Sequence, residues 1–259
     1  MAIPQLKWDV AFLKNNSVLK SSSYGIPVEL KSIHYPIRLI RYWFTYHLLR
    51  LEANKVNGGL SVCEIGVDTG QMLGFMNAAE TSTKSKVAIK NWDAIDCLIR
   101  KEILEPVGYK NFYEVDLEGA DFQLDPHQQY DAMVMLHVLE HLFNPEALIT
   151  KLVPHLKEGG AMIGGFPSLP KCMEQAREKK IRPKARKFGH VSVFSPERVM
   201  KMAKDNGLEV EFFSGAFFFR KKGFFLENFV WWFRFNLWFG AMFPAWPGET
   251  YWLIRKPKI

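Results

Sequence analysis

A glycine-rich turn carries the first group of residues that could do chemistry. It follows a short apolar run, and Glu64, Gly66, Asp68 and Gly70 alternate along it. A turn that cradles a pyrophosphate needs Gly-x-Gly-x-x-Gly, whose middle glycine lets the backbone approach the phosphates at a helix N-terminus. Asp68 stands at that middle position, where a carboxylate repels pyrophosphate but accepts hydrogen bonds from amino or hydroxyl groups. The turn therefore indicates a polar cofactor without phosphates.

The elements that must position this turn follow from the pattern between residues 60 and 166. Short apolar runs alternate there with longer amphipathic stretches, which is typical of βαβ units that form a parallel sheet. Ligands of such sheets bind beyond the carboxyl ends of the strands, so the turn should lie in a ligand cleft. We expect strands at Leu60–Ile65, Lys86–Asn91, Phe112–Asp116, Ala132–Leu136, Ala161–Phe166, Glu209–Phe213 and Tyr251–Arg255. We expect helices at Gln71–Ala79, Ala94–Leu104, Pro145–His155 and about 196–206.

The chain of 259 residues has room for one large α/β domain with additions. Its 48% hydrophobic and 24% charged residues exclude disorder and a disulfide-stapled miniprotein. We expect an N-terminal extension or cap at 1–57, with a helix from about Pro36 to Ala53, and a main domain at 58–259. Three unclustered cysteines and a start without an apolar signal sequence make the cytoplasm the expected compartment.

Polar residues recur where successive expected strands end. Asp93 follows the second strand, Asp116 and Leu117 end the third, and the fourth runs into His137-Val-Leu-Glu-His141. Together with the glycine turn, this series resembles the class I S-adenosylmethionine-dependent methyltransferases over about residues 60–207. The resemblance implies a Rossmann-like, doubly wound, mostly parallel seven-stranded sheet with an antiparallel last strand. It also implies S-adenosyl-L-methionine as the cofactor.

The same resemblance assigns roles to the residues at the strand ends. Asp93 would bind both ribose hydroxyls, and Asp116 with Leu117 would flank the adenine. The expected cofactor-binding residues are Glu64, Gly66, Asp68, Gly70, Asp93, Asp116, Leu117 and His137.

Histidines are the candidates for a catalytic base. In methyl transfer from a sulfonium the cofactor brings the activation, so a base is needed only where the acceptor must lose a proton. Imidazole titrates near neutral pH, which makes His190, His137 and His141 candidates. His190 is the first choice, because it follows the fifth strand and should face the cleft beyond the methyl group.

A metal site is an alternative that we do not favour. His137, Glu140, His141 and His190 resemble the Glu-x-x-Glu-His plus His set of ubiquinone-pathway O-methyltransferases and small-RNA 2′-O-methyltransferases. A divalent ion held there would lower the pKa of an acceptor hydroxyl. In this chain His137 replaces the first acidic residue of that set.

Two unusual segments bear on the acceptor. Residues 171–187 carry eight basic and two acidic residues, so we expect a basic substrate loop at 171–190 that attracts phosphate or carboxylate. An aromatic insertion is expected at 217–248. Its apolar part, Phe224–Met242, is interrupted by charges, which makes it a poor membrane span. It is better interpreted as a lid, a homodimer contact or an interfacial helix at the inner face of the membrane.

These features favour O-methylation of an anionic small molecule or of a lipid-linked or glycan-linked acceptor. The end of the chain, from Phe243 to Lys256, also resembles methyltransferases of surface-polysaccharide synthesis. Nucleic-acid methylation is the competing class, but the basic run is short and no base-flipping motif is present, so a nucleic-acid partner is not favoured. A non-catalytic, methyltransferase-like binding protein is the third interpretation, and it predicts no cofactor binding.

Overall fold

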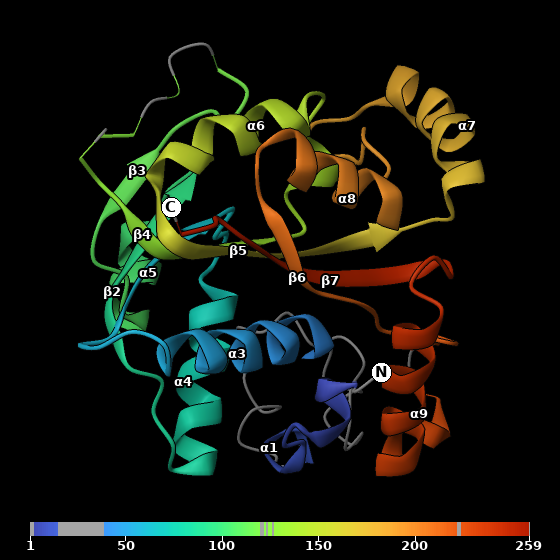
Figure 1. Cartoon of the computed structure of the whole chain (residues 1–259), viewed down its shortest axis with the longest axis horizontal. Coiled ribbons are helices and arrows are strands. Elements are labelled where there is room, and N and C mark those ends of the chain that lie inside the picture. The colour runs from blue at the N-terminus through green and yellow to red at the C-terminus, as the bar shows by residue number, and fades with distance from the viewer. Residues whose placement is uncertain are drawn as a thin grey trace.

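The structure is a computed structural model that describes residues 3–14, 39–119, 122, 124–125, 127–221 and 224–258. Its centre is a seven-stranded sheet in the order β3-β2-β1-β4-β5-β7-β6 (Figure 1). β7 runs antiparallel to both of its neighbours, and the other pairings are parallel. The predicted fold class is therefore confirmed. The strands are β1 (Leu60–Ile65), β2 (Ile89–Asp96), β3 (Phe112–Glu114), β4 (Tyr130–Leu136), β5 (Leu156–Ser168), β6 (Glu209–Gly215) and β7 (Gly248–Arg255).

Helices cover both faces of the sheet, and each face has its own hydrophobic cluster. α3 (Ile40–Ala53), α4 (Gln71–Thr83) and α9 (Val230–Met242) lie on one face, and α6 (Pro145–Leu152) and α8 (Pro196–Asp205) lie on the other (Figure 1). Side chains of a strand alternate between the two clusters, as the pleat requires. The remaining helices are η1 (Pro4–Lys7), α1 (Ala11–Lys14), α5 (Lys101–Val107), η5 (Leu139–His141), η6 (Val153–His155), α7 (Lys171–Ile181), η7 (Arg182–Lys184) and η8 (Phe225–Asn228).

The boundaries expected around the second strand were wrong. β2 is not Lys86–Asn91 but continues to Asp96, and the next helix, α5, begins at Lys101 rather than at Ala94. The polar sequence Asn91-Trp92-Asp93 suggested a strand end. Trp92 and Asp93 are instead buried inside the sheet, where hydrogen bonds satisfy both side chains. This shift changes which acidic residue stands at the carboxyl edge.

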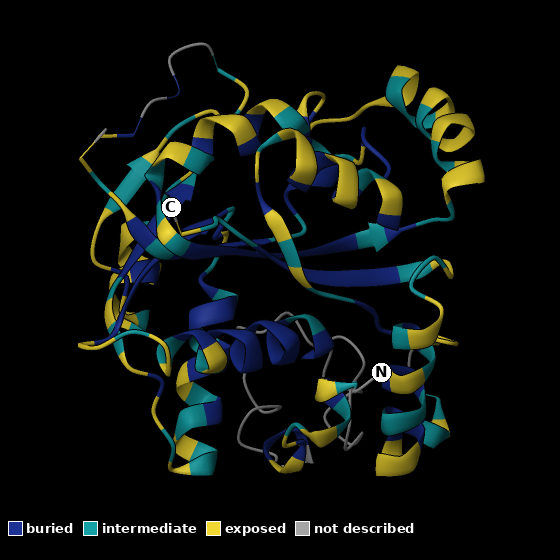
Figure 2. Ribbon diagram, viewed as in Figure 1, coloured by how far each residue is buried: buried dark blue, intermediate teal, exposed yellow. Residues whose placement is uncertain are grey.

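The helix of the N-terminal segment is a core element. Ten of the fourteen residues of α3 are buried, and the helix packs against β4, β5 and β7 (Figure 2). The first residues of the expected helix, 36–38, lie outside the described part of the chain. α3 therefore carries its side chains directly onto the face of the sheet that holds the glycine turn.

The basic and aromatic segments are attached at the same end of the sheet. α7 follows the carboxyl end of β5, α9 precedes β7, and Ser168 of β5 pairs with Gly248 of β7. The expected basic loop at 171–190 is thus largely helical; none of its α7 residues is buried, so no apolar periodicity marked it. α9 lies against β6 backbone to backbone, since a Cβ on Gly240 would come within 2.2 Å of the Gly215 oxygen. No helix in the described ranges is long and apolar enough to cross a bilayer.

Candidate active site

A pocket of about 200 Å³ lies at the carboxyl ends of β1 and β4. It brings together four residues that the sequence predicted, namely Glu64, Gly66, Asp68 and His137. The other lining residues are Arg41, Tyr42, Val67, Gln71, Met72 and Leu136.

The glycine turn forms the floor of this pocket. Gly66 has a φ of +75°, and a Cβ there would lie 2.3 Å from Cγ2 of Val138, so only glycine fits. Asp68 also adopts a left-handed conformation, with a φ of +45°, which aspartate tolerates better than most residues. Its carboxylate accepts a 2.7 Å hydrogen bond from Arg100. Gly70 ends the turn at the N-cap of α4 with a φ of +73°, although it does not line the pocket.

Glu64 is a buried acid in the pocket wall. Its Oε2 accepts hydrogen bonds from the Tyr109 hydroxyl at 2.7 Å and from Trp92 Nε1 at 3.0 Å. Burial raises the pKa of Glu64 to about 7, even though the two hydrogen bonds act to lower it. The folded protein therefore holds a proton on Glu64 across a pH range in which the unfolded chain has released it.

This pKa shift predicts a pH-dependent stability. The stabilisation is complete below about pH 4.5, the ordinary pKa of Glu64, and is lost as the pH rises through about 7. The shift corresponds to about 3 kcal/mol. We therefore expect wild type to lose about 3 kcal/mol of its free energy of unfolding between pH 4 and pH 8, and we expect Glu64→Gln not to show this loss. Urea unfolding of both proteins at each pH measures this difference, and parallel pH profiles would contradict it.

The second strand places Asp96, not Asp93, beside the pocket. Asp93 points to the opposite face of the sheet, where it is fully buried and accepts hydrogen bonds from Tyr130, Gln128 and Asn111. Asp96 ends β2, and its Oδ2 accepts the backbone N–H of Asp68 at 3.0 Å. A displacement of three residues along a strand moves a side chain to the other face as well as toward the end. The predicted position of Asp93 at the strand end was therefore wrong.

Asp116 and Leu117 lie beyond the end of β3, which stops at Glu114 rather than at Asp116. Asp116 is exposed, and its Oδ1 accepts the backbone N–H of Glu118 at 3.0 Å. Leu117 packs at the margin of the α6 and α8 cluster. Neither residue lines the pocket, so their contact with an adenine stays a prediction.

α3 supplies two polar residues that the sequence did not predict for the site. The Tyr42 hydroxyl donates a hydrogen bond to the side-chain oxygen of Gln71 at the start of α4. Arg41 lies 3.5 Å from a carboxylate oxygen of Glu249, and its buried Nε has no hydrogen-bond partner within the described part of the chain. A cation in the lining of the pocket suits a negatively charged group of a ligand.

His137 stands between two carboxylates. Its Nδ1 lies 3.0 Å from Glu140, and its Nε2 lies 3.8 Å from Glu249. Burial lowers the pKa of His137, but the attraction of the two carboxylates outweighs burial and the net pKa is raised. This shift favours the charged imidazolium of His137, which is a poorer proton acceptor than a neutral ring; its role as a base stays a prediction.

His190 and His141 lie on the far side of Glu140. Their rings meet edge to face with centroids 4.8 Å apart, and His141 Nδ1 contacts the Gly189 carbonyl at 3.2 Å. Burial, the largest influence, lowers the pKa of His190, so its imidazole is neutral and able to accept a proton.

The same cluster bears on the metal alternative. Ligand atoms of Glu140, His141 and His190 lie within 4.8 Å of one another. The fourth residue of the resembling set, His137, turns its Nδ1 toward a carboxylate oxygen of Glu140 at 3.0 Å. Because this contact already occupies the acidic ligand, the fit to a divalent cation is partial, and we derive no step through a metal.

A second pocket of about 280 Å³ opens beside His190. Basic side chains of α7 and of the segment after it line this pocket, and no acidic residue does. None of these side chains forms an ion pair in the part of the chain that the structure describes. The lining residues are Arg177, Lys180, Ile181, Lys184, Arg186, Gly189 and His190.

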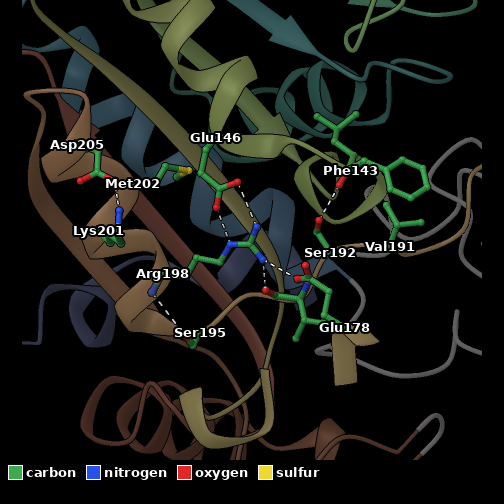
Figure 3. A network of polar contacts seen from close by, with 12 residues as sticks. Phe143, Glu146, Glu178, Val191, Ser192, Ser195, Arg198, Lys201, Met202 and Asp205 are labelled. Atoms are coloured by element: carbon green, nitrogen blue, oxygen red, sulfur yellow. Dashed lines mark hydrogen bonds and ion pairs between the residues drawn. The ribbon is translucent and has the colours of Figure 1, made fainter. Parts of the chain in front are cut away.

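A polar network holds this exposed helix in place. Arg198 of α8 bonds both oxygens of Glu146 and also bonds Glu178 on α7, as Figure 3 shows. Arg182 pairs with Glu178 at 2.6 Å and donates to the carbonyl of Val191. Glu178 thus serves to hold α7 in place, whereas basic side chains of α7 line the pocket.

A doubly wound sheet with an antiparallel last strand, a glycine turn after β1 and an acid ending β2 defines the class of S-adenosylmethionine-dependent methyltransferases. A family model described as a methyltransferase domain matches residues 35–211, and the chain belongs to this family. The predicted enzyme class is confirmed. No curated protein matches the chain in sequence.

Solved structures are similar in fold. The N-methyltransferase NodS from Bradyrhizobium japonicum, in complex with S-adenosyl-L-homocysteine, has a TM-score of 0.52 and 16% identity over 94% of this chain and 100% of that one. A Bacillus halodurans protein described as a methyltransferase has a TM-score of 0.52 and 18% identity over 82% and 99% of the two chains. A Galdieria sulphuraria protein described as a sarcosine dimethylglycine methyltransferase has a TM-score of 0.54 and 14% identity over 84% and 87%.

Proposed function

We propose that the chain transfers a methyl group from S-adenosyl-L-methionine to an oxygen atom of an anionic small-molecule acceptor. One observation carries the acceptor side of this proposal. The row His137, Glu140, His141 and His190 runs from the pocket of the glycine turn to the basic pocket. The cofactor and the charged end of an acceptor would therefore bind on either side of one base.

Residues of the first pocket, together with Asp96 beside it, divide between the parts of the cofactor. Asp96 accepts hydrogen bonds from the ribose hydroxyls, because it is the acid that ends β2 beside Asp68. Gly66 lets the cofactor approach the backbone. Arg41 binds the methionyl carboxylate through its guanidinium group, which gives a role to the cation that α3 places in the pocket lining.

When bound, the cofactor supplies a methyl group already activated on a sulfonium. The protein then aligns the acceptor and removes its proton. His190 takes the hydroxyl proton, His141 orients the His190 ring, and His137 stays fixed between Glu140 and Glu249. The basic pocket holds a phosphate or carboxylate of the acceptor, and this anchor sets the position of the acceptor hydroxyl relative to His190.

Acceptor charge gives the test. We expect radiolabelled methyl transfer to a panel of hydroxylated phosphates and carboxylates to exceed transfer to matched neutral alcohols by about ten-fold or more, as one charge-assisted contact provides. Lys180→Glu/Lys184→Glu should remove this preference and leave binding of S-adenosylhomocysteine unchanged. Lys86→Glu/Lys90→Glu is the matched control, because these exposed lysines lie at the amino end of β2.

Three outcomes would contradict parts of the proposal. Equal transfer to neutral acceptors would remove the anionic acceptor. Transfer to nitrogen rather than oxygen, or to a nucleic acid in the same panel, would replace the acceptor class. Absence of S-adenosylhomocysteine binding in calorimetry would indicate a non-catalytic relative.

A further inference from the structure

α9 presents apolar side chains on both of its faces. Its inner face, with Trp232, Phe233 and Leu237, is buried against the sheet. A helix covering a domain normally carries polar residues on its outer face. The outer face of α9 instead carries Trp231 and Trp238, which are 55% and 42% exposed. Together with Leu6, Arg234 and Phe235, they line a groove of about 370 Å³.

The apolar outer face continues beyond the helix as one surface. Of the seventeen exposed large hydrophobic residues in the described part of the chain, ten lie between residues 218 and 246. Ring contacts connect this set from Trp246 through Phe218 and Phe239 to Phe235 and onward to Trp231. We call these ten residues the aromatic surface: Phe218, Phe219, Phe225, Phe229, Val230, Trp231, Trp238, Met242, Phe243 and Trp246.

The size of the aromatic surface exceeds what a monomer normally leaves in water. A half-exposed aromatic side chain presents about 100 Å². Eight such side chains therefore present several hundred Å², at or beyond the largest patch of a typical monomer. A surface of this size is expected to have an occupant.

Charges around the surface select the kind of occupant. Between residues 217 and 246 the sequence has four basic residues and one acidic residue, Glu227. Glu227 is buried, whereas Lys221 is exposed and Arg220, although exposed, is paired with Glu249. Lys7 of η1 is also exposed, and η1 packs against α9. A second copy would bring like charges together, whereas an anionic bilayer is complementary to both the charge and the tryptophans.

We propose that the aromatic surface docks on the surface of an anionic lipid bilayer, with Trp231 and Trp238 at the headgroup boundary. α9 lies in the plane of the membrane and does not cross it, in keeping with its thirteen residues. This inference stands apart from the proposed acceptor, because it rests on residues outside both pockets.

Vesicle flotation tests the docking. Full-length protein is mixed with vesicles of phosphatidylcholine, or of phosphatidylcholine with phosphatidylglycerol, and centrifuged on a density gradient. We expect wild type to float with the anionic vesicles and to be released by high salt. Trp231→Ser/Trp238→Ser should reduce the floating fraction by about ten-fold or more, since two apolar anchors are lost. Lys7→Glu/Lys221→Glu should also reduce it without altering the apolar face.

The matched control is Leu51→Ser/Met200→Ser, which removes two residues of similar exposure outside the aromatic surface. Calorimetry with S-adenosylhomocysteine shows that each variant is folded, and it separates failure of docking from failure of the proposed function. Wild type that stays in the soluble fraction with anionic vesicles at low salt would overturn the proposal. So would a tryptophan variant that floats like wild type. A dimer in light scattering that the tryptophan variant dissociates, without flotation, would assign the surface to a second copy.

Discussion

Replacing Asp96 by asparagine is expected to weaken S-adenosylhomocysteine binding by about 10- to 100-fold, since a charged acceptor of hydrogen bonds is lost. Asp96 is only partly buried and ends its strand, so the unfolding free energy should change by less than about 1 kcal/mol. The matched variant Asp93→Asn should do the opposite. Its carboxylate is fully buried and accepts three hydrogen bonds, so its loss should cost about 3 kcal/mol of stability.

Isothermal titration calorimetry and urea unfolding of the two variants measure both effects. We expect Asp93→Asn to retain cofactor affinity within about three-fold once it is folded, because its side chain points away from the pocket. If Asp93→Asn instead lost affinity while Asp96→Asn kept it, the assignment of the ribose contact to the end of β2 would be wrong.

Gly66→Ala is expected to abolish detectable cofactor binding. The new Cβ would lie 2.3 Å from Val138 Cγ2, in a residue whose φ is +75°. Overpacking costs about 1–3 kcal/mol, and the left-handed conformation adds about 1 kcal/mol. To relieve this clash, the floor of the pocket must move. Because a displacement of about 1 Å in a site can cost about 100-fold, the affinity for the cofactor should fall by more than about 100-fold.

Gly207→Ala separates the two causes. Gly207 has a φ of +66°, but a Cβ there would meet nothing within 4 Å. This variant should lower the free energy of unfolding by about 1 kcal/mol through backbone strain and leave the affinity for the cofactor unchanged. Val138→Ala added to Gly66→Ala should recover stability, because it removes the atom that clashes. Binding by Gly66→Ala at wild-type affinity would contradict the proposed role of the turn.

The sequence predicted the sheet because burial on both faces leaves a strong pattern. Continuous apolar runs at β1 and β4 and the glycine turn between β1 and α4 are local signals, and the structure agrees with them. The end of β2 was less visible. Asp93 is a polar residue in the sheet interior, and polar residues there are satisfied by partners far along the chain, such as Tyr130. Residues Trp92 to Ile95 are all buried, so the run Trp92-Asp-Ala-Ile-Asp96 carries no polar and apolar alternation that would mark a continuing strand.

Residues contributed by other elements escaped prediction for a different reason. Arg41 and Glu249 are more than 200 positions apart, and only the packing of α3 beside β7 brings them together at the pocket. The helical state of α7 was also hidden, since a helix with no buried face has no hydrophobic period. Its order comes from the network around Arg198, which joins three segments.

At Gly240 the backbone of α9 touches the backbone of β6 at Gly215, and no side chain lies between the two at that point. Two backbones in direct contact cannot slide or tilt independently, so α9 and the strands that carry the pocket move as one body. A protein seated through α9 would therefore hold its methyl donor at a constant height above the lipid headgroups. Acceptors would then be selected by the length of the spacer between their anchor and the hydroxyl.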